Sequence, residues 1–294
     1  MNTMTEDTLV QQTTADYLLN NLHWDDSIYG MDEVLGREGT LGRESEKDIV
    51  LTRYLDEALK RLNPDLPEEA YRDAMRQIID VNRAQSMLAI NQEKDALYKS
   101  GVLVSYRDEN NERQRKTLRI FNFDHPDNNH FLVVRELWVK GDIYRRRADL
   151  VGFINGIPLI FMEVKNLHKD VKAAYEQNFC DYKDTVPHLF YHNALVILGN
   201  GVEAKVGSLS SRYEHFNDWK RLHEEEPGVV DMETLLKGVC AKANLLDLFE
   251  NYIVFDDSSG KLIKIVARNH QLLGVNRAIE AVKNRESLAG KLGV

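Results

Sequence analysis

Three charged side chains stand at the ends of apolar runs between residues 147 and 165. Asp149 borders the run 150–154, and Glu163 and Lys165 follow the run 157–162. Successive side chains on a strand point to opposite faces, so Glu163 and Lys165 would share a face. A charge in a buried strand costs free energy unless it is paired or binds a metal. The segment therefore predicts either a buried ion pair or a metal site.

The pair Asn155-Gly156 separates the two runs and predicts a hairpin. A strict two-residue turn would place Asp149 and Glu163 on opposite faces, which excludes a shared metal. A three-residue turn over 154–156, with its glycine left-handed in a bulge, would pair Asp149 with Phe161. The two carboxylates would then be diagonal neighbours on one face. A shared metal site therefore predicts the three-residue, bulged turn.

The chemistry of such a site follows from its oxygen ligands. Asp149, Glu163 and the backbone carbonyl of Val164 would form a hard site suited to Mg²⁺, completed by water and substrate phosphate. The metal would polarise the phosphate and lower the pKa of a bound water. Lys165 would orient that water or offset charge on the phosphorus. Spacing and burial alone support this phosphodiester hydrolysis and a structural ion pair about equally.

A wider stretch, Arg146 to Asn166, closely resembles the nuclease signature of the R subunit of type I restriction–modification enzymes. That family has a PD-(D/E)xK-type nuclease at its N-terminus. The resemblance implies an α/β fold, a restriction-endonuclease-like core with a mixed central sheet flanked by helices. It also implies that Asp149, Glu163 and Lys165 are catalytic and that Mg²⁺ is the cofactor. Further matching segments are 41–46, 59–64, 187–190 and 200–201.

Supporting residues are also implied by the resemblance. The family follows its lysine with a Gln-x-x-x-Tyr motif on the next helix. Here Gln177 stands five residues before Tyr182, whereas Asn178 has the family spacing, so either Asn178 replaces the glutamine or the register slips by one. For the aromatic residues of this stripe, core packing is the alternative. Related nucleases take one more acid from an N-terminal helix; Glu44 and Glu46 are the candidates, and helix capping is the alternative role, above all for Glu46.

The end of the chain carries a second resemblance. In the family a glutamine at the position of Gln271, just ahead of the motor, contacts the adenine of ATP; a glutamine near a helix start is the structural alternative. No Gly-x-x-x-x-Gly-Lys-Ser/Thr phosphate loop occurs in the sequence. We expect an N-terminal fragment that neither hydrolyses ATP nor translocates. Its expected parts are an extension (1–40), an endonuclease-like domain (41–250), and a linker with the start of the motor (251–294).

Composition limits the partners and the compartment. Only two cysteines and no signal peptide or apolar transmembrane run occur, which favours the cytoplasm and no membrane contact. The net charge of −9 is unusual for a DNA-binding module, because phosphate contacts depend on Lys and Arg. Either a local patch such as Arg145–Arg147 contacts DNA, or other subunits and the motor hold it. The second interpretation is favoured.

The order of elements expected from the sequence is α/β. Residues 1–21 are polar and expected to begin loosely. Helices are expected from Ser45 to residue 62, from Pro67 to 79, over 83–98, over 170–183 and within 231–250. Strands are expected at 102–106, 117–122, 131–140, 192–198, 202–207, 251–256 and 261–266, in addition to the hairpin around Asn155.

Two functions of different class remain. The first is a Mg²⁺-dependent, non-specific endonuclease domain that cuts double-stranded DNA after ATP-driven translocation, with methyltransferase and specificity subunits as partners. The second is a non-catalytic, nuclease-like docking module that links the motor to the methyltransferase core. The acidic balance and the shifted Gln177/Asn178 position favour docking slightly. The intact set of Asp149, Glu163 and Lys165 favours the nuclease.

Overall fold

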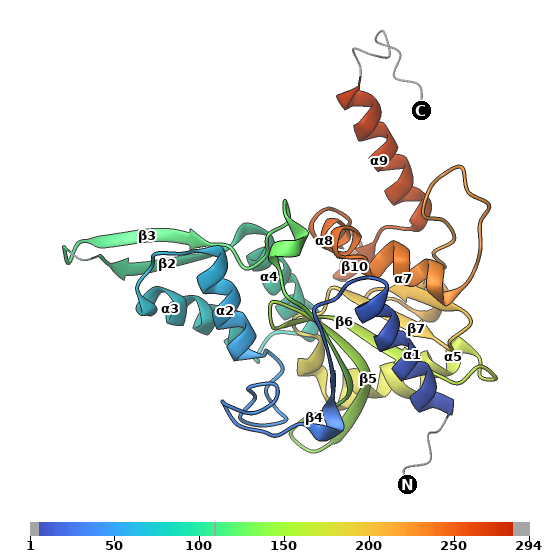
Figure 1. The fold of residues 1–294 in the computed structure, drawn as a ribbon, viewed down its shortest axis with the longest axis horizontal. Coiled ribbons are helices and arrows are strands. Elements are labelled where there is room, and N and C mark those ends of the chain that lie inside the picture. Colours follow the sequence, from blue (N-terminus) through green and yellow to red (C-terminus); the bar gives the residue numbers. More distant parts are fainter. Residues whose placement is uncertain (1–5, 109, 285–294) are drawn as a thin grey trace.

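A six-stranded mixed sheet forms the centre of the molecule (Figure 1), in the order β1-β4-β5-β6-β7-β8. We analysed a computed structural model that describes residues 6–108 and 110–284. β1 runs parallel to β4 and β7 parallel to β6, and the other neighbours are antiparallel. The expected α/β core with a mixed sheet is therefore confirmed. The strands are β1 Asp26–Tyr29, β4 Phe131–Lys140, β5 Arg145–Ile154, β6 Ile157–Val164, β7 Leu195–Gly199 and β8 Ala204–Gly207.

Both faces of this sheet are covered, which explains why β6 is buried at every residue. One apolar cluster contains Leu150, Ile160 and Met162, and a second contains Phe153 and Phe161. A strand covered on both faces is apolar throughout rather than alternating. Within the described residues, no helix is long and apolar enough to cross a membrane.

The N-terminal segment differs from expectation. Residues Glu6–Asn20 form the helix α1, and Val10, Ala15 and Leu18 pack into the core. The loose start expected for 1–21 is therefore wrong over these residues; residues 1–5 lie outside the described part. The helix was missed because its inner face also carries polar side chains, among them the buried Gln11, so no apolar stripe marks it.

The next helix, α2 (Thr52–Leu62), begins seven residues later than the expected Ser45. The Ser45 amide donates to Asp48 Oδ2 at 2.8 Å, so these residues close a separate turn. The Leu51 amide, just before the helix, donates to the Gly156 carbonyl at 2.9 Å. The start of α2 is thus set by its contact with the β5–β6 turn rather than by a local cap.

The remaining elements follow the expected order. α3 (Glu68–Ile79) is confirmed after Pro67, and α4 covers Met87–Ser100. β2 (Val102–Arg107) and β3 (Arg113–Leu118) pair as a separate hairpin that projects from the body (Figure 1), so the strand expected at 117–122 lies earlier. The C-terminal elements are α7 Met232–Cys240, α8 Lys242–Asn251, β9 Ile253–Asp256, β10 Ile263–Val266 and α9 Asn269–Lys283. The domain boundaries at 40 and 250 stay predictions, and residues 285–294 of the expected motor start lie outside the described part.

The turn at Gly156 has no space for a side chain. Its φ is +79°, and a Cβ there would lie 2.5 Å from the Leu51 carbonyl oxygen. Gly260 has almost the same φ, +80°, with no atom within 4 Å of its Cβ position. We expect Gly156→Ala to lower the free energy of unfolding in urea by roughly 3 kcal/mol or more, and Gly260→Ala by about 1 kcal/mol. Equal losses would contradict the close approach of α2 to this turn.

The buried Lys264 of β10 should make the stability of the fold depend on pH. Its Nζ donates to Asn91 Oδ1 at 2.9 Å and to the Asn193 carbonyl, and burial lowers its pKa to about 7. Between pH 7 and about 10.4 the unfolded chain binds a proton that the folded protein does not, so stability rises with pH. Lys264→Met lacks the titrating amine, so the difference in unfolding free energy between wild type and this variant isolates Lys264. We expect this difference, wild type minus variant, to rise by on the order of 2 to 4 kcal/mol across this window. A pH-independent difference would show that Lys264 keeps its charge when folded.

Candidate active site

The turn between β5 and β6 has two residues, not three. Ile154 pairs with Ile157, and Asn155 (φ +50°) and Gly156 (φ +79°) are both left-handed, as in the tight hairpin turn that matches strand twist. The predicted three-residue turn is therefore wrong. The Asn155 side chain is fully buried and donates to the Ile120 carbonyl and to Asn129 Oδ1, each at 2.8 Å. These bonds hold Asn155 in the turn itself.

One extra residue is needed to bring Asp149 and Glu163 to the same face, and it lies within the strands of the hairpin rather than in its turn. Phe153 pairs with Pro158 but Gly152 pairs with Ile160, so Leu159 is left over as a bulge. Pro158 has no amide hydrogen for the ladder, and proline within a sheet is confined to edges and bulges. On the other strand, beside the bulge, a Cβ on Gly152 would meet the Trp24 ring at 2.9 Å.

The bulge decides the relation of the two carboxylates. Leu150 pairs with Met162, so continuing the register by one residue sets Asp149 directly opposite Glu163 on the same face. The expected partner of Asp149, Phe161, is therefore wrong by two positions. The two carboxylates nevertheless share a face, as expected, because a one-residue bulge shifts the pairing register of the two strands by one residue, as a longer turn would.

Asp149 is held from two sides. Its Oδ2 accepts the Val164 amide at 3.0 Å, and its Oδ1 accepts Gln11 Nε2 at 2.9 Å. Gln11 comes from α1 and was not considered in the sequence analysis. A single buried glutamine on a polar helix carries no sequence signal, and only packing of α1 on the sheet brings it to Asp149.

Glu163 and Lys165 contact each other as their spacing predicts. Lys165 Nζ donates to Glu163 Oε1 at 3.2 Å and to Asn178 Oδ1 at 2.6 Å. Both charged residues are buried, Glu163 at 1% and Lys165 at 8% exposure. Lys165 thus lies between a carboxylate and a neutral amide oxygen, and its position is fixed by both.

Glu163 carries an unsatisfied buried oxygen. Its Oε2 is buried without a hydrogen-bond partner. Burial, followed by the neighbouring charge of Asp149, raises the pKa of this carboxyl well above its usual range, and Lys165 opposes the shift. Two adjacent carboxylates with one unsatisfied oxygen form a site whose donors fit a divalent cation.

The helix after β6 supplies the other contacts. α5 (Val171–Ala173), the π-helical segment η3 (Ala174–Phe179) and α6 (Cys180–Thr185) form one continuous helix in the place expected. Asn178 contacts Lys165, whereas Gln177 is exposed. Of the two alternatives, the structure places Asn178 at the lysine. π-helical turns insert a residue into a helix and occur often at functional sites.

Tyr182 closes the site from the same helix. It is buried, its hydroxyl donates to the Arg147 carbonyl at 2.6 Å, and its ring packs edge-on against Phe161 at 5.4 Å. Burial and the charges of Glu163 and Asp149 raise the pKa of Tyr182. It therefore stays protonated and ties the helix to β5, in agreement with core packing as the alternative role.

Two predicted site residues lie elsewhere. Glu46 forms an ion pair with Arg145, 2.5 Å between Oε1 and Nη2, and Arg145 precedes Asp149 by four residues, about 13 Å along a strand. The structure does not bring Glu46 to the carboxylate pair. Gln271 Oε1 accepts the Arg268 amide at 2.8 Å and caps α9. Its contact with ATP stays a prediction.

Metal ligation would depend on few protein groups. Over residues 6–108 and 110–284, no three His, Cys, Asp or Glu side chains gather as a metal site. Asp149, Glu163 and the Val164 carbonyl are the expected ligands. Two carboxylates with water and phosphate to complete the shell suit Mg²⁺, which keeps several waters and is bound by one or two carboxylates.

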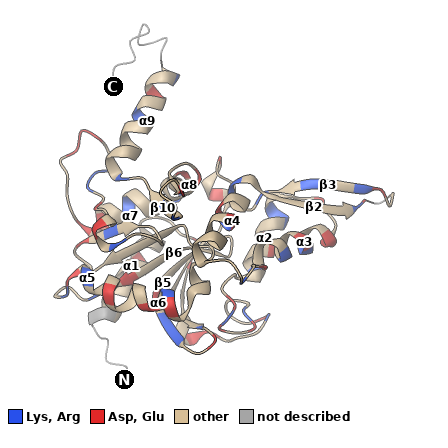
Figure 2. Cartoon of the chain, turned by 180° about the vertical axis from the view of Figure 1, so that it is seen from behind, with Lys and Arg blue, Asp and Glu red and all other residues tan. Residues whose placement is uncertain are grey.

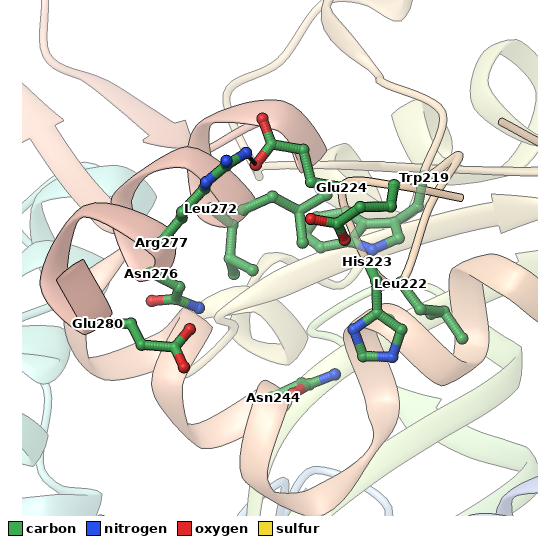
Figure 3. A pocket seen from close by; sticks show the side chains of 12 residues that line it. Trp219, Leu222, His223, Glu224, Asn244, Leu272, Asn276, Arg277 and Glu280 are labelled. Carbon is green, nitrogen blue, oxygen red and sulfur yellow. Dashed lines mark hydrogen bonds and ion pairs between the residues drawn. The ribbon is translucent and has the colours of Figure 1, made fainter. Parts of the chain in front are cut away.

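A separate pocket of about 340 Å³ lies near α9 and does not include the carboxylate pair (Figure 3). Arg277 and Glu224 form an ion pair at its rim, 2.6 Å between Nη1 and Oε2. Trp219 and Leu272, which also line it, belong to the main core. The pocket marks the place where α9 packs on the loop after residue 218, and neither Asp149 nor Glu163 lines it.

Known proteins resemble this chain over most of its length. The endonuclease subunit of the type I restriction enzyme HindI from Haemophilus influenzae is 33% identical over 273 residues, which are 90% of this chain and 25% of that protein. The SauCOLORF180P type I endonuclease subunit from Staphylococcus aureus is 23% identical over 158 residues, 52% of this chain and 16% of that protein. The chain thus spans about a quarter or less of these relatives.

A family model covers the whole carboxylate site. The model of the type I restriction enzyme R protein N terminus matches residues 3–215, a range that includes Gln11, the β5–β6 hairpin and Tyr182. The match, the mixed α/β core and the identity to HindI agree with one another. The chain therefore belongs to the family of type I restriction enzyme R protein N termini.

Proposed function

We propose that this chain is the endonuclease domain of a type I restriction enzyme R subunit and hydrolyses DNA phosphodiester bonds with Mg²⁺. One observation carries the proposal: Asp149 and Glu163 lie opposite each other on β5 and β6, with Lys165 bonded to Glu163 at 3.2 Å. An ion pair alone would need one carboxylate and one cation. A second acid next to Glu163 raises its pKa further and is explained by a divalent cation.

The roles of the side chains follow from their contacts. Asp149, Glu163 and the Val164 carbonyl would hold the cation, which supplies Lewis-acid polarisation of the phosphate when bound. Lys165 would stabilise negative charge on the phosphate oxygens, and its bonds to Glu163 and Asn178 keep its ammonium group in place. The bonds from Gln11 and from the Val164 amide would fix the orientation of Asp149.

The site requires partners for specificity. No feature of the cluster reads a base sequence, and the proposed cleavage is non-specific. In this proposal the methyltransferase and specificity subunits choose the target, and ATP-driven translocation by the rest of the R subunit brings double-stranded DNA to the site. Gln271 would contact ATP in the complete subunit.

Cleavage by the complete enzyme tests the role of Glu163. We expect Glu163→Gln in the full R subunit to reduce double-strand cleavage of plasmid DNA by at least about 100-fold, because the cation loses a charged ligand. ATP hydrolysis should stay at the wild-type rate. The matched control is Glu203→Gln, which changes the chain's other Glu-x-Lys sequence. Wild-type cleavage by Glu163→Gln would leave a docking module as the function.

Cation binding and stability test the carboxylate pair without DNA. We expect Mn²⁺ to bind the wild-type chain saturably in calorimetry and at least about tenfold more weakly after Asp149→Ala. Without divalent cations, Glu163→Gln should raise the free energy of unfolding by about 1 kcal/mol, since it removes a buried, unsatisfied carboxylate oxygen. Adding Mn²⁺ should raise the melting temperature of wild type only. If Glu163→Gln instead destabilises the cation-free chain, the group is a structural ion-pair member.

A further inference from the structure

The arginines at 145–147, one of the two alternatives weighed for contact with DNA, form ion pairs within the protein. Arg145 pairs with Glu46, Arg146 with Asp181 at 2.5 Å, and Arg147 with Glu136 at 3.3 Å. Each of these charges is matched by a carboxylate from a neighbouring element. The run 145–147 therefore stabilises the start of β5 and offers little free positive charge to a phosphate.

The hairpin β2–β3 shows the opposite arrangement. In its register Arg107 pairs with Arg113 and Ser105 with Arg115, and these three arginines lie on one exposed face. The other face contains Val102, Val104 and Leu118, which are buried in the main core. The hairpin is thus anchored on one side and basic on the other, and Figure 2 shows the basic segments of β3 in blue.

These hairpin cations are not neutralised by the described residues. Arg107, Arg113, Arg115 and Lys116 have no ion pair there; Arg107 donates to the Asn111 carbonyl at 2.8 Å. Arg107 and Arg113 directly face each other, an arrangement that costs stability unless an anion lies over both. The sequence 102–119 has five cations and three acids, net +2, in a chain of net charge −9.

The described acids of the hairpin, Asp108 and Glu112, lie at its tip. Asp108 accepts the amides of Asn110 and Glu112, each at 2.9 Å, and Gln114 Nε2 at 2.7 Å, so it closes the turn. The face that carries Arg113 and Arg115 along β3 also contains Leu103 and Thr117, which are uncharged. Arg113 and Arg115 therefore follow each other on this face with no described carboxylate between them.

We propose that the exposed face of β2–β3 binds the backbone of duplex DNA through Arg107, Arg113 and Arg115. This inference rests on the proposed nuclease function and names the surface that holds its substrate. A two-stranded ribbon fits the major groove of B-DNA. Arg113 and Arg115 are two residues apart, about 6.6 Å along the strand, close to two base-pair steps of the duplex.

The test measures binding of the 294-residue chain to a labelled duplex by fluorescence anisotropy, from about 50 to about 200 mM salt. We expect the variant R107Q/R113Q/R115Q to bind at least about tenfold more weakly at the low-salt end. Its slope of log affinity against log salt should fall by about 2.7 in magnitude, since each lost phosphate contact removes about 0.9. The matched control, R37Q/R212Q/K261Q, removes three exposed positive charges elsewhere, so its net charge equals that of R107Q/R113Q/R115Q. We expect this control to bind the duplex like wild type.

Folding is checked by thermal melting. The variant R107Q/R113Q/R115Q, called the ribbon variant here, should melt at or above the wild-type temperature, because it removes the like charges of Arg107 and Arg113 that face each other. If the triple variant does not fold, Arg113→Gln alone should lower the slope by about 0.9. An unchanged slope in the ribbon variants, equal weakening by the control, or no duplex binding by wild type would overturn the inference.

Failure of the nuclease proposal has a different signature. Glu163→Gln lies outside the ribbon and should leave duplex affinity unchanged. If the complete enzyme cuts DNA normally with Glu163→Gln while the ribbon variant loses affinity, the catalytic assignment fails and the DNA surface stands. If Glu163→Gln abolishes cutting while the ribbon variant binds like wild type, the DNA surface fails and the catalytic assignment stands.

Discussion

The direct opposition of Asp149 and Glu163 is the constraint on which the rest of the site depends. Two acids side by side in a buried sheet are unfavourable, because burial and mutual repulsion act together on the same carboxyl. The neighbouring groups are arranged to reduce this cost: a backbone amide and Gln11 donate to Asp149, and Lys165 donates to Glu163. The Oε2 atom of Glu163 has no hydrogen-bond donor beside it, which agrees with the proposed cation site.

This opposition is produced by one residue in the hairpin. A two-residue turn alone would place the acids on opposite faces, and the bulge at Leu159 returns them to the same face. Leu159 and Ile160, adjacent in sequence, both point into the same core cluster, as such a bulge requires. Pro158 favours the bulge by lacking an amide hydrogen, and Trp24 occupies the space above Gly152.

The arginines of this chain fall into two groups that the net charge does not distinguish. The arginines nearest the carboxylate pair are used in ion pairs that fix the start of β5. Arg107, Arg113 and Arg115, which have no ion pair to a described residue, lie on a hairpin that projects from the body (Figure 1), away from the sheet that holds the carboxylates. An acidic protein can therefore present a locally basic surface, because screening limits the reach of distant charges to about 10 Å.

The sequence predicted the local features: the charged trio, the apolar run of β6, the helix after Pro67, the family resemblance and the α/β order. It did so because strand alternation, burial of apolar runs and proline stereochemistry act over a few residues. Long-range contacts were needed to establish four features: the two-residue turn with its bulge, the contact of Lys165 with Asn178, the bond from Gln11 to Asp149, and the ion pairs of Arg145–Arg147. Each of these depends on contacts between residues far apart in the chain, such as Gln11 with Asp149, and no local pattern encodes them.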